Sequence, residues 1–550
     1  MLRVTELRLP LDHPPEALEE ALAERLGSRP FAWQLIRRGH DARNRRDIRL
    51  VYTVDAALDE AAEARALARG DPRIRPAPDM RYRYIARAPE GFAERPVVVG
   101  TGPCGLFAAL LLAQMGFRPI ILERGQPVRV RTRDTWGLWR RHELKPESNV
   151  QFGEGGAGTF SDGKLYSQIR DPLLHGRKVL TEFVKAGAPE EILYLAKPHI
   201  GTFRLVTVVE NLRAEIEGLG GEYRFGTRLE ELVLDPATRA VRGARLSDGS
   251  LLPCRFLILA PGHSARDTFA MLHALGVAMH AKPFSIGLRI EHPQSVIDAA
   301  RFGRFARHPL LGAADYKLVH HASNGRSVYS FCMCPGGRVV AATSEEGQVV
   351  TNGMSQYSRA EFNANAALVV GVEPRDFGGE GPLAGIAFQR HWERLAFEAG
   401  GGAYRAPVQR VEDFLAGRPS TALGSVTPSY KPGVTPTDLS RCLPDYAVAA
   451  LREALPRFGR QIPGFDMPDA VLTGVETRTS SPLRIDRTDL CESPNTPGLF
   501  PAGEGAGYAG GILSAAVDGI RVAEAVACAM LGQELPPERR RHGVISEGWG

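Results

Sequence analysis

The sequence has few cysteines, few aromatic residues and no long apolar run. Its 550 residues include seven cysteines, an odd number whose spacing forms no disulfide framework, so we expect reduced thiols in a reducing compartment. The most apolar windows, 106–115 and 512–530, are too short or too interrupted to span a bilayer, and no apolar signal segment opens the chain. We therefore expect a cytoplasmic protein without membrane association.

A strong net charge is also missing. Lys and Arg number 68 against 63 Asp and Glu, a formal charge of +5, which gives little reason to expect a polyanionic partner. Hydrophobic residues make up 43% of the chain, as in ordinary globular proteins, and no repeat interrupts it. Glycine and proline are abundant, with 59 and 40 residues, which is typical of tight turns and of backbone that approaches a ligand.

The spacing of apolar residues divides the chain into five parts. Residues 1–90 predict a small α+β module that ends in a proline-rich linker. Residues 95–265 alternate strands with helices, which predicts a parallel sheet, and residues 266–470 predict a mostly antiparallel α+β cap domain. Residues 471–532 are expected to complete the parallel-sheet domain, and residues 533–550 are expected to form a loosely ordered tail. The fold class is therefore α/β.

A strand, a glycine-rich turn and a helix open the second part, at residues 96–110. In this G-x-G-x-x-G pattern Gly100 makes the tight turn and Gly105 lets helix and strand pack closely. Gly102 and the following Pro103 let a pyrophosphate approach the helix N-terminus. The next strand ends in Glu123, where a carboxylate that binds an adenosine ribose is expected. The unit predicts a dinucleotide-binding Rossmann domain.

A second element near the other end of the chain selects the dinucleotide. Residues 498–505 form a short strand with an acidic end, and a glycine-rich turn leads into an apolar helix. They resemble the element of glutathione-reductase-like flavoproteins that holds the ribitol and faces the flavin ring. Residues 255–263 resemble the strand by which such a chain leaves the FAD domain, with Gly262 at the cofactor. The FAD contacts expected from this second element are Gly503, Glu504, Gly510, Gly511 and Ile512.

The segment after Glu123 is basic. An arginine from it, Arg124, Arg131 or Arg133, pairs with FAD phosphate or ribose in one interpretation. In the other interpretation these residues form a solvated helix face.

Five further motifs identify a family. They are N-V-Q-F-G-E-G-G-A-G-T-F-S-D-G-K-L at 149–165, K-P-H-I-G-T at 197–202, F-C-M-C-P-G-G at 331–337, N-G-M-S at 352–355 and T-R-T-S-S-P at 477–482. Together they closely resemble a bacterial family of FAD-dependent dehydrogenases of unknown substrate, over essentially the whole chain. The resemblance implies an FAD protein and leaves the reaction open.

The glycine-dense loop at residues 153–159 lets the backbone approach a flat ring. We expect Gly155, Gly156 and Thr159 to contact the flavin, although a purely structural turn has the same composition.

Three residues are candidates for the chemistry. Arg478 can orient an anionic substrate or stabilise reduced flavin without titrating. Cys332 and Cys334, two apart on one strand, are expected to point to the same face as free thiols, because a metal site needs two more ligands. His199 is a candidate acid or base, although a lone histidine is more often a hydrogen-bonded structural group.

The sequence predicts an FAD-dependent dehydrogenase or reductase of a small molecule, with hydride transfer at the flavin N5 atom. No second G-x-G-x-x-G follows a strand, so either NAD(P)H visits the flavin transiently or the substrate itself reduces it. One alternative is an RNA-directed flavoenzyme that docks tRNA through the arginine-rich residues 37–49, although nucleic acid is not the partner we expect. Another is a redox sensor that binds flavin without turnover. The sequence leaves the oligomeric state open.

Overall fold

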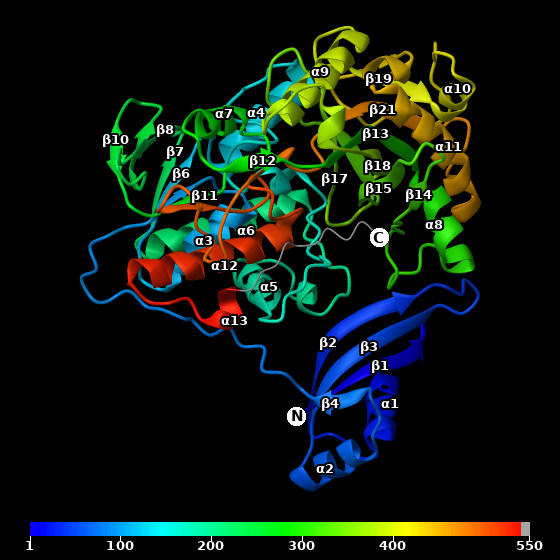
Figure 1. Ribbon diagram of the computed structural model, residues 1–550. Coiled ribbons are helices and arrows are strands. Elements are labelled where there is room, and N and C mark those ends of the chain that lie inside the picture. The colour runs from blue at the N-terminus through cyan, green and yellow to red at the C-terminus, as the bar shows by residue number, and fades with distance from the viewer. Residues whose placement is uncertain (541–550) are drawn as a thin grey trace.

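The computed structural model describes residues 1–540 and shows three parts (Figure 1). The N-terminal module projects from two larger, adjoining parts, one with a parallel sheet and one that forms the cap. Within residues 1–540 no helix combines the length and the apolar character that a membrane span requires.

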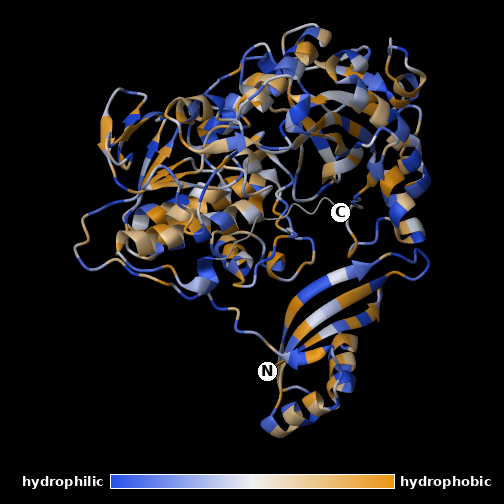
Figure 2. Cartoon of the chain, in the orientation of Figure 1, coloured by the Kyte–Doolittle hydropathy of each residue, from blue (hydrophilic) through white to orange (hydrophobic). Residues whose placement is uncertain are grey.

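The module is a four-stranded antiparallel sheet in the order β2-β3-β1-β4, with a β-α-β-β-α-β chain order that is ferredoxin-like. Its elements are β1 (Leu2–Pro10), α1 (Ala17–Leu26), β2 (Ala32–Asp41), β3 (Arg49–Ala57), α2 (Glu60–Ala68) and β4 (Ile74–Pro76). Hydrophobic and hydrophilic residues alternate along its strands (Figure 2), because one face packs on the helices.

The second part contains a five-stranded parallel sheet in the order β23-β11-β5-β6-β7. Its strands are β5 (Val97–Val99), β6 (Ile120–Glu123), β7 (Glu222–Phe225), β11 (Leu257–Leu259) and β23 (Leu499–Pro501). Its longer helices are α3 (Pro103–Gln114), α4 (Val128–Arg141), α5 (His175–Lys185), α6 (Thr202–Gly218), α7 (Arg266–Ala274) and α12 (Ile512–Met530). α3 and α12 pack against each other although about 400 residues separate them, so both ends of this part form one core.

Smaller elements complete this part. They are η1 (Ala157–Phe160), η2 (Glu190–Leu193), the three-stranded sheet of β8 (Leu229–Leu234), β9 (Val241–Leu246) and β10 (Leu251–Pro253), the pair β12 (Met279–Ala281) and β22 (Leu483–Ile485), and α13 (Pro537–Arg540). The last one falls in the predicted tail, of which residues 541–550 lie outside the described residues.

The cap is built on a seven-stranded sheet in the order β14-β15-β18-β13-β21-β19-β20. Neighbouring strands are antiparallel except β19 and β20. The strands are β13 (Phe284–Pro293), β14 (Val319–His321), β15 (Ser327–Cys334), β18 (Asn363–Val372), β19 (Ala406–Arg410), β20 (Val434–Pro436) and β21 (Val471–Glu476), and β16 (Gly337–Ala341) pairs with β17 (Thr351–Ser355). The cap helices are α8 (Gln294–Phe302), η3 (Gly303–Phe305), η4 (Pro374–Asp376), α9 (Ala384–Ala399), α10 (Val411–Ala416), η5 (Leu439–Cys442) and α11 (Asp445–Gln461).

The boundary expected after residue 470 lies one strand too early. β21 pairs with β13 and β19 in the centre of the cap sheet, so the cap continues through Glu476. The apolar residues of β21 do not distinguish the two sheets, because a fully buried strand has the same pattern in a parallel and in an antiparallel sheet.

Candidate functional site

A cleft of about 2000 Å³ lies where the three parts meet. Its floor is the carboxyl edge of the parallel sheet, where β5, β6, β11 and β23 end and where ligands bind in open parallel sheets. The cap strand β15 forms one wall, and the sheet of the N-terminal module forms another. The cleft is therefore built by segments that lie far apart in the sequence.

The glycine-rich turn after β5 lies on the floor of the cleft. Gly100 has a φ of 94°, and a Cβ there would lie 2.2 Å from the Ala260 carbonyl oxygen, so the turn requires glycine. A Cβ on Gly105 would lie 1.9 Å from the Gly100 oxygen, because α3 packs directly on the turn. Gly102 and Pro103 line the cleft at the first turn of α3, where unpaired N–H groups and the positive end of the helix dipole are found.

The carboxylate at the end of β6 is buried beside this turn. Glu123 Oε2 accepts hydrogen bonds from the backbone N–H and the hydroxyl of Thr101, at 3.0 and 2.5 Å. Its Oε1 accepts from the N–H groups of Gly125 and Gly153, at 2.8 and 3.1 Å. Glu123 also lines the cleft, so a fixed hydrogen-bond acceptor lies next to the glycine turn.

A second helix, α12, also begins at the cleft. The N–H of Gly503 donates to Asp518 Oδ2 at 2.8 Å, which ties the end of β23 to α12. Glu504 Oε1 lies 3.9 Å from His263 Nε2. The residues from this end of the chain that line the cleft are Gly503, Glu504, Gly510, Gly511 and Ile512. Two helix N-termini therefore lie on the same cleft.

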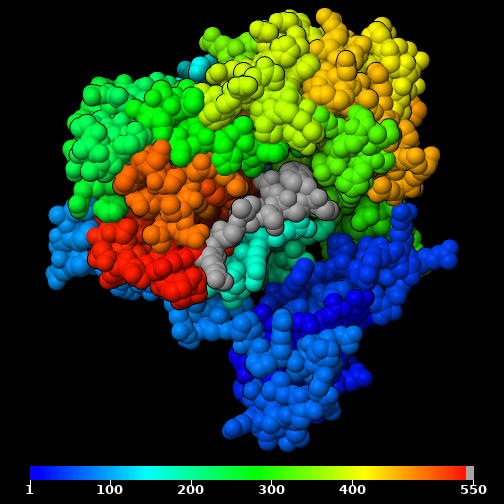
Figure 3. Space-filling model, viewed as in Figure 1, coloured from blue at the N-terminus to red at the C-terminus, as the bar shows by residue number. Residues whose placement is uncertain are grey.

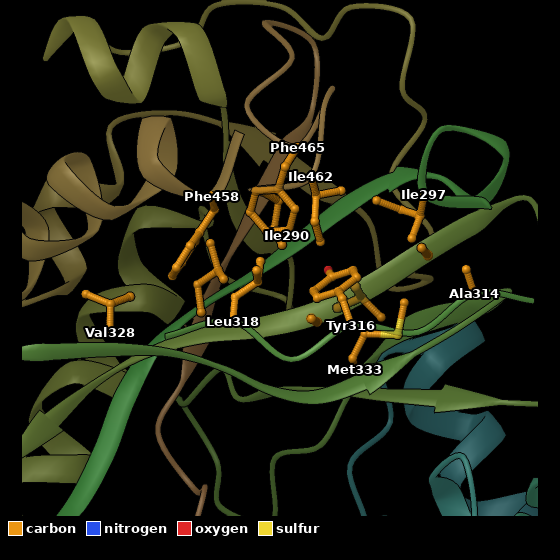
Figure 4. Packing of buried hydrophobic residues seen from close by; sticks show 14 of the residues in the cluster. Ile290, Ile297, Ala314, Tyr316, Leu318, Val328, Met333, Phe458, Ile462 and Phe465 are labelled. Carbon is orange, nitrogen blue, oxygen red and sulfur yellow. The ribbon is translucent and has the colours of Figure 1, made fainter. Parts of the chain in front are cut away.

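The cap places Cys332 on the opposite wall. A β-bulge between Phe331 and Cys334 interrupts the alternation of β15. Because of the bulge, Cys332 is exposed to the cleft and Cys334 is buried. Met333 between them packs into the cap core near Tyr316 (Figure 4). Both residues line the cleft, Cys332 as an exposed and Cys334 as a buried free thiol.

The Cys332 thiol is protonated at neutral pH. The surrounding protein withdraws it from bulk water, which raises its pKa to about 12 although Lys164 and Arg289 act in the opposite direction. The Cys332 carbonyl accepts a hydrogen bond from Arg289 Nη2 at 2.7 Å, and Lys164 Nζ donates to the carbonyl of Met333. These contacts fix the end of β15 with the thiol on the cleft.

His199 lines the cleft as a neutral ring. It stacks on Tyr357, with ring centroids 5.3 Å apart, and its Nε2 lies 2.9 Å from the Tyr357 carbonyl oxygen. Burial, together with the charge of Arg359, lowers the pKa of His199 to about 4. Arg359 in turn pairs with Asp162, its Nε 2.9 Å from Oδ1. His199 is thus a hydrogen-bonding group and not a cation at neutral pH.

Arg478 lines the cleft, but its charge is balanced inside the protein. Its guanidinium donates to both carboxylate oxygens of Glu393, at 3.0 Å each, and to the Ser344 hydroxyl at 2.7 Å. Arg266 binds the same carboxylate at 2.8 and 3.0 Å and Glu345 at 2.7 Å. Burial and the neighbouring Arg266 lower the pKa of Arg478. Arg478 ties the end of β21 to α9 and is not the free cation expected from the sequence.

Comparison with known families identifies two segments of the chain. Residues 283–479 match the family described as FAD-dependent protein, C-terminal domain-like, and residues 1–57 match a domain of unknown function, DUF8436. The chain is also 48% identical over 529 residues to a protein of Clostridium beijerinckii named as uncharacterized, which covers 95% of this chain and 98% of that one. This chain belongs to the same family as that protein. The cofactor of this chain is FAD.

Similar solved structures include a glycine oxidase from Bacillus cereus, an L-proline dehydrogenase from P. horikoshii and a flavoprotein/dehydrogenase from Cytophaga hutchinsonii. Their sequences are 9%, 12% and 12% identical, and each TM-score is 0.35. They cover 80%, 81% and 81% of this chain and 98%, 95% and 81% of their own. This likeness is distant, so nothing about the substrate is taken from it.

The floor of the cleft fits FAD. A Cβ on Gly262 or Gly511 would meet nothing within 4 Å, so both positions are open to a ligand. Gly156 lines the cleft next to Gly102, and a Cβ on it would lie 2.7 Å from the Gly102 Cα. Glu123 would accept hydrogen bonds from ribose hydroxyls, and the N-termini of α3 and α12 supply donors for phosphate and flavin oxygens.

Arg131, Gly155 and Thr159 support this floor from behind, which corrects the expectation that they contact FAD. Arg131 is fully buried, and its guanidinium donates to three backbone carbonyls at 2.7 Å. Burial lowers its pKa to about 10. The Gly155 N–H donates to the Thr101 carbonyl at 2.9 Å, and the Thr159 carbonyl accepts from the Thr202 hydroxyl at 2.6 Å. These groups bind protein partners and do not line the cleft.

Arg124 lines the cleft but is also balanced by protein carboxylates. It pairs with Glu147 at 2.8 Å and Asp267 at 2.9 Å, and its guanidinium lies 4.0 Å from the centre of the Phe152 ring. It therefore braces the floor of the cleft and provides no free positive charge for a phosphate.

Sequence reasoning did not single out Lys164 or Arg359. Lys164 lies in the S-D-G-K run at 161–164, which is part of a family motif. Within residues 1–540 it forms no ion pair with an acidic side chain, so the motif already contained this candidate cation. Arg359 is 197 residues away from its partner Asp162 and had no local signal.

Proposed function

We propose that the protein is an FAD-dependent oxidoreductase whose small-molecule substrate binds between the FAD floor and the Cys332 wall. The observation that carries the proposal is that one cleft contains both a dinucleotide cradle and a wall of polar side chains, Cys332 from the cap and Lys164 and His199 from the segment between η1 and α6. The flavin supplies hydride transfer at its N5 atom. The chain itself binds and orients the substrate and keeps water away from it.

The polar groups of the wall have distinct proposed roles. Lys164 forms no ion pair with a carboxylate among the described residues and donates to the Met333 carbonyl, so we assign it to an anionic group of the substrate. Neutral His199 offers a hydrogen bond, and the protonated Cys332 thiol offers a weak one. Arg478 is a positioning residue that holds β21 on α9.

The proposal includes the architecture. We assign residues 95–282 and 480–532 to a glutathione-reductase-like FAD-binding domain, residues 283–479 to the cap and residues 1–90 to the module. The parallel strand order and the match over residues 283–479 support this division.

The test is anaerobic reduction of the purified yellow protein by NADH, NADPH and a panel of metabolites, followed by the visible flavin absorbance. We expect at least one of them to bleach the flavin. Lys164→Met should slow bleaching by an organic acid or phosphate at least about tenfold, the effect of one lost charged hydrogen bond, with FAD content unchanged. Lys145→Met, an exposed lysine away from the cleft, is the matched control.

Two outcomes would contradict the proposal. If the protein contains no FAD, the cofactor assignment fails. If FAD is present but no compound reduces it and no acceptor reoxidises it, a redox sensor without turnover replaces the enzyme.

A further inference from the structure

The sheet of the N-terminal module has one covered face and one open face. α1 and α2 cover the face that carries Leu2, Val4 and Val54. The opposite face lines the cleft with four arginines, Arg3, Arg8, Arg37 and Arg75, and two carboxylates, Glu6 and Asp41, together with Thr5, Gly39, Val51 and Thr53. The open face is therefore polar and basic, and it looks into the same cleft as the FAD floor.

Direct contacts hold this face over the cleft. The Arg38 N–H donates to the Tyr194 carbonyl at 2.6 Å, and the Arg38 carbonyl accepts from the Ala196 N–H at 2.9 Å. His308 Nε2 of the cap lies 2.8 Å from Asp12 Oδ1 of the module. The module projects as a lobe and touches the remaining chain along its upper edge (Figure 3). It therefore acts as a wall of the cleft.

Five exposed cations that line this wall and the facing cap have no acidic partner among residues 1–540. Arg75 is one of them, and we call the other four, Arg37, Arg45, Arg301 and Lys317, the vestibule cations. All four are exposed and line the cleft. Nearby Arg8 and Arg43 differ, because both pair with Asp41. Unbalanced positive charge in a concave site concentrates anions there.

Further charges connect the vestibule with the Cys332 wall. Lys197 Nζ lies 2.6 Å from Asp315 Oδ2. Partial burial raises the pKa of Asp315, but Lys197, Lys164 and Arg359 together lower it, so all three cations act on one carboxylate. Three cations and the Asp315 carboxylate therefore lie together at the corner where the substrate is proposed to bind.

The cleft is also larger than one ligand needs. Small-molecule sites measure roughly 300 to 1000 Å³, and this cleft has about 2000 Å³. FAD on the floor leaves a volume of similar size between the module and the cap. Residues 1–540 form one five-stranded parallel sheet, and its carboxyl edge belongs to FAD, so a second dinucleotide has to bind elsewhere.

We propose that the vestibule cations bind the phosphate groups of a second dinucleotide, NADP(H). This inference rests on the proposed function, because a nicotinamide dinucleotide is the reductant that such an enzyme requires if its substrate is not itself the reductant. Guanidinium groups bind phosphate in a bidentate manner. NADP(H) carries one phosphate more than NAD(H), which suits a site with four unbalanced cations.

The test is the binding of NADP⁺ to the FAD-loaded protein by calorimetry, since the oxidised form binds without reducing the flavin. We expect Arg37→Ala/Arg45→Ala and Arg301→Ala/Lys317→Ala each to weaken binding at least about tenfold, with FAD content unchanged. NAD⁺ should bind more weakly than NADP⁺, and added salt should weaken both. Arg65→Ala, an exposed arginine of α2 outside the cleft, should bind like the wild type.

Three results would overturn the inference. Wild-type affinity in both double variants would remove the vestibule cations from dinucleotide binding. A yellow protein that binds no NADP⁺ would reject the inference and leave the proposed function standing, whereas a protein without FAD would reject both. Salt-sensitive tRNA binding that the same variants lose, without NADP⁺ binding, would assign the wall to RNA.

Discussion

The two sides of the cleft are built in different ways. The FAD floor consists of backbone: glycines at a tight turn, two helix N-termini and one carboxylate, Glu123, held by N–H groups. The cap side consists of side chains in charge networks whose partners come from distant segments, such as Glu393 with Arg478 and Asp162 with Arg359. Cofactor contacts therefore depend on local sequence, whereas the substrate side depends on how the domains pack. Substitutions on each side test this difference.

The largest effect is expected at Gly102. A Cβ there would meet only the Gly156 Cα, at 3.8 Å, so the chain can still fold, but the remaining valine atoms would occupy the path of the pyrophosphate. Gly102→Val should lose FAD by at least about a hundredfold in affinity. The measurement is flavin absorbance per protein after gel filtration, together with circular dichroism.

Cys104→Ser is the control for Gly102→Val, because it changes a buried side chain of α3 that is close in size. It should keep FAD near the wild-type level. Equal loss from both variants would mean that α3 tolerates no change and that pyrophosphate access at Gly102 is not decisive.

These glycines show why the floor could be predicted from the sequence. Gly100, Gly102 and Gly105 have fixed spacing because the turn, the pyrophosphate approach and the helix packing each need a residue without a side chain. The glycine-rich turn before Ile512 is local in the same way. The sequence position of Arg131 suggests a phosphate ligand. In the structure its partners are backbone carbonyls of residues 149–154, which come together only on folding. A single sequence does not reveal which arginines are already balanced inside the protein.

The next largest effect is expected at Glu393, which balances the buried Arg266 and Arg478. Glu393→Gln leaves two buried guanidinium groups near each other with too little negative charge, so we expect a loss of about 3–5 kcal/mol in the free energy of unfolding. Urea unfolding measures it. Glu398→Gln on the same helix, where the carboxylate is exposed and lies 3.8 Å from Arg394, should change stability by less than about 0.5 kcal/mol. Similar losses from both would show that the Glu393 network does not hold the cap together.

A smaller effect should appear in the pH dependence of stability. The pKa of His199 is about 4 in the folded protein against an ordinary value of 6.5. As the pH falls below 6.5, His199 takes up a proton in the unfolded state but not in the folded state. The stability from the neutral ring is therefore fully present above pH 6.5 and is lost as the pH falls toward about 4. The slope is at most about 1.4 kcal/mol per pH unit.

His199→Gln should reduce this slope in urea titrations between about pH 7 and about pH 4. It should not abolish the slope, because burial also lowers the pKa of His263 and His292. His273→Gln, an exposed histidine of α7, is the matched control. An unchanged slope in His199→Gln would show that the ring is not held neutral.

The smallest effect is expected at Arg124, although the sequence places it directly after Glu123, the proposed ribose ligand. Its charge is balanced by Glu147 and Asp267, and Arg228 lies 2.8 Å from the first and 3.6 Å from the second, so it can replace the lost partner. Arg124→Gln should change FAD affinity less than about threefold and stability by less than about 1 kcal/mol. Glu123→Gln, measured in the same flavin-release assay, should weaken FAD at least about tenfold, because an amide is a poorer acceptor for ribose hydroxyls than a carboxylate. If Arg124→Gln instead weakens FAD as strongly as Glu123→Gln, the guanidinium contacts the cofactor directly, and the floor depends on side-chain charge as much as the cap side does.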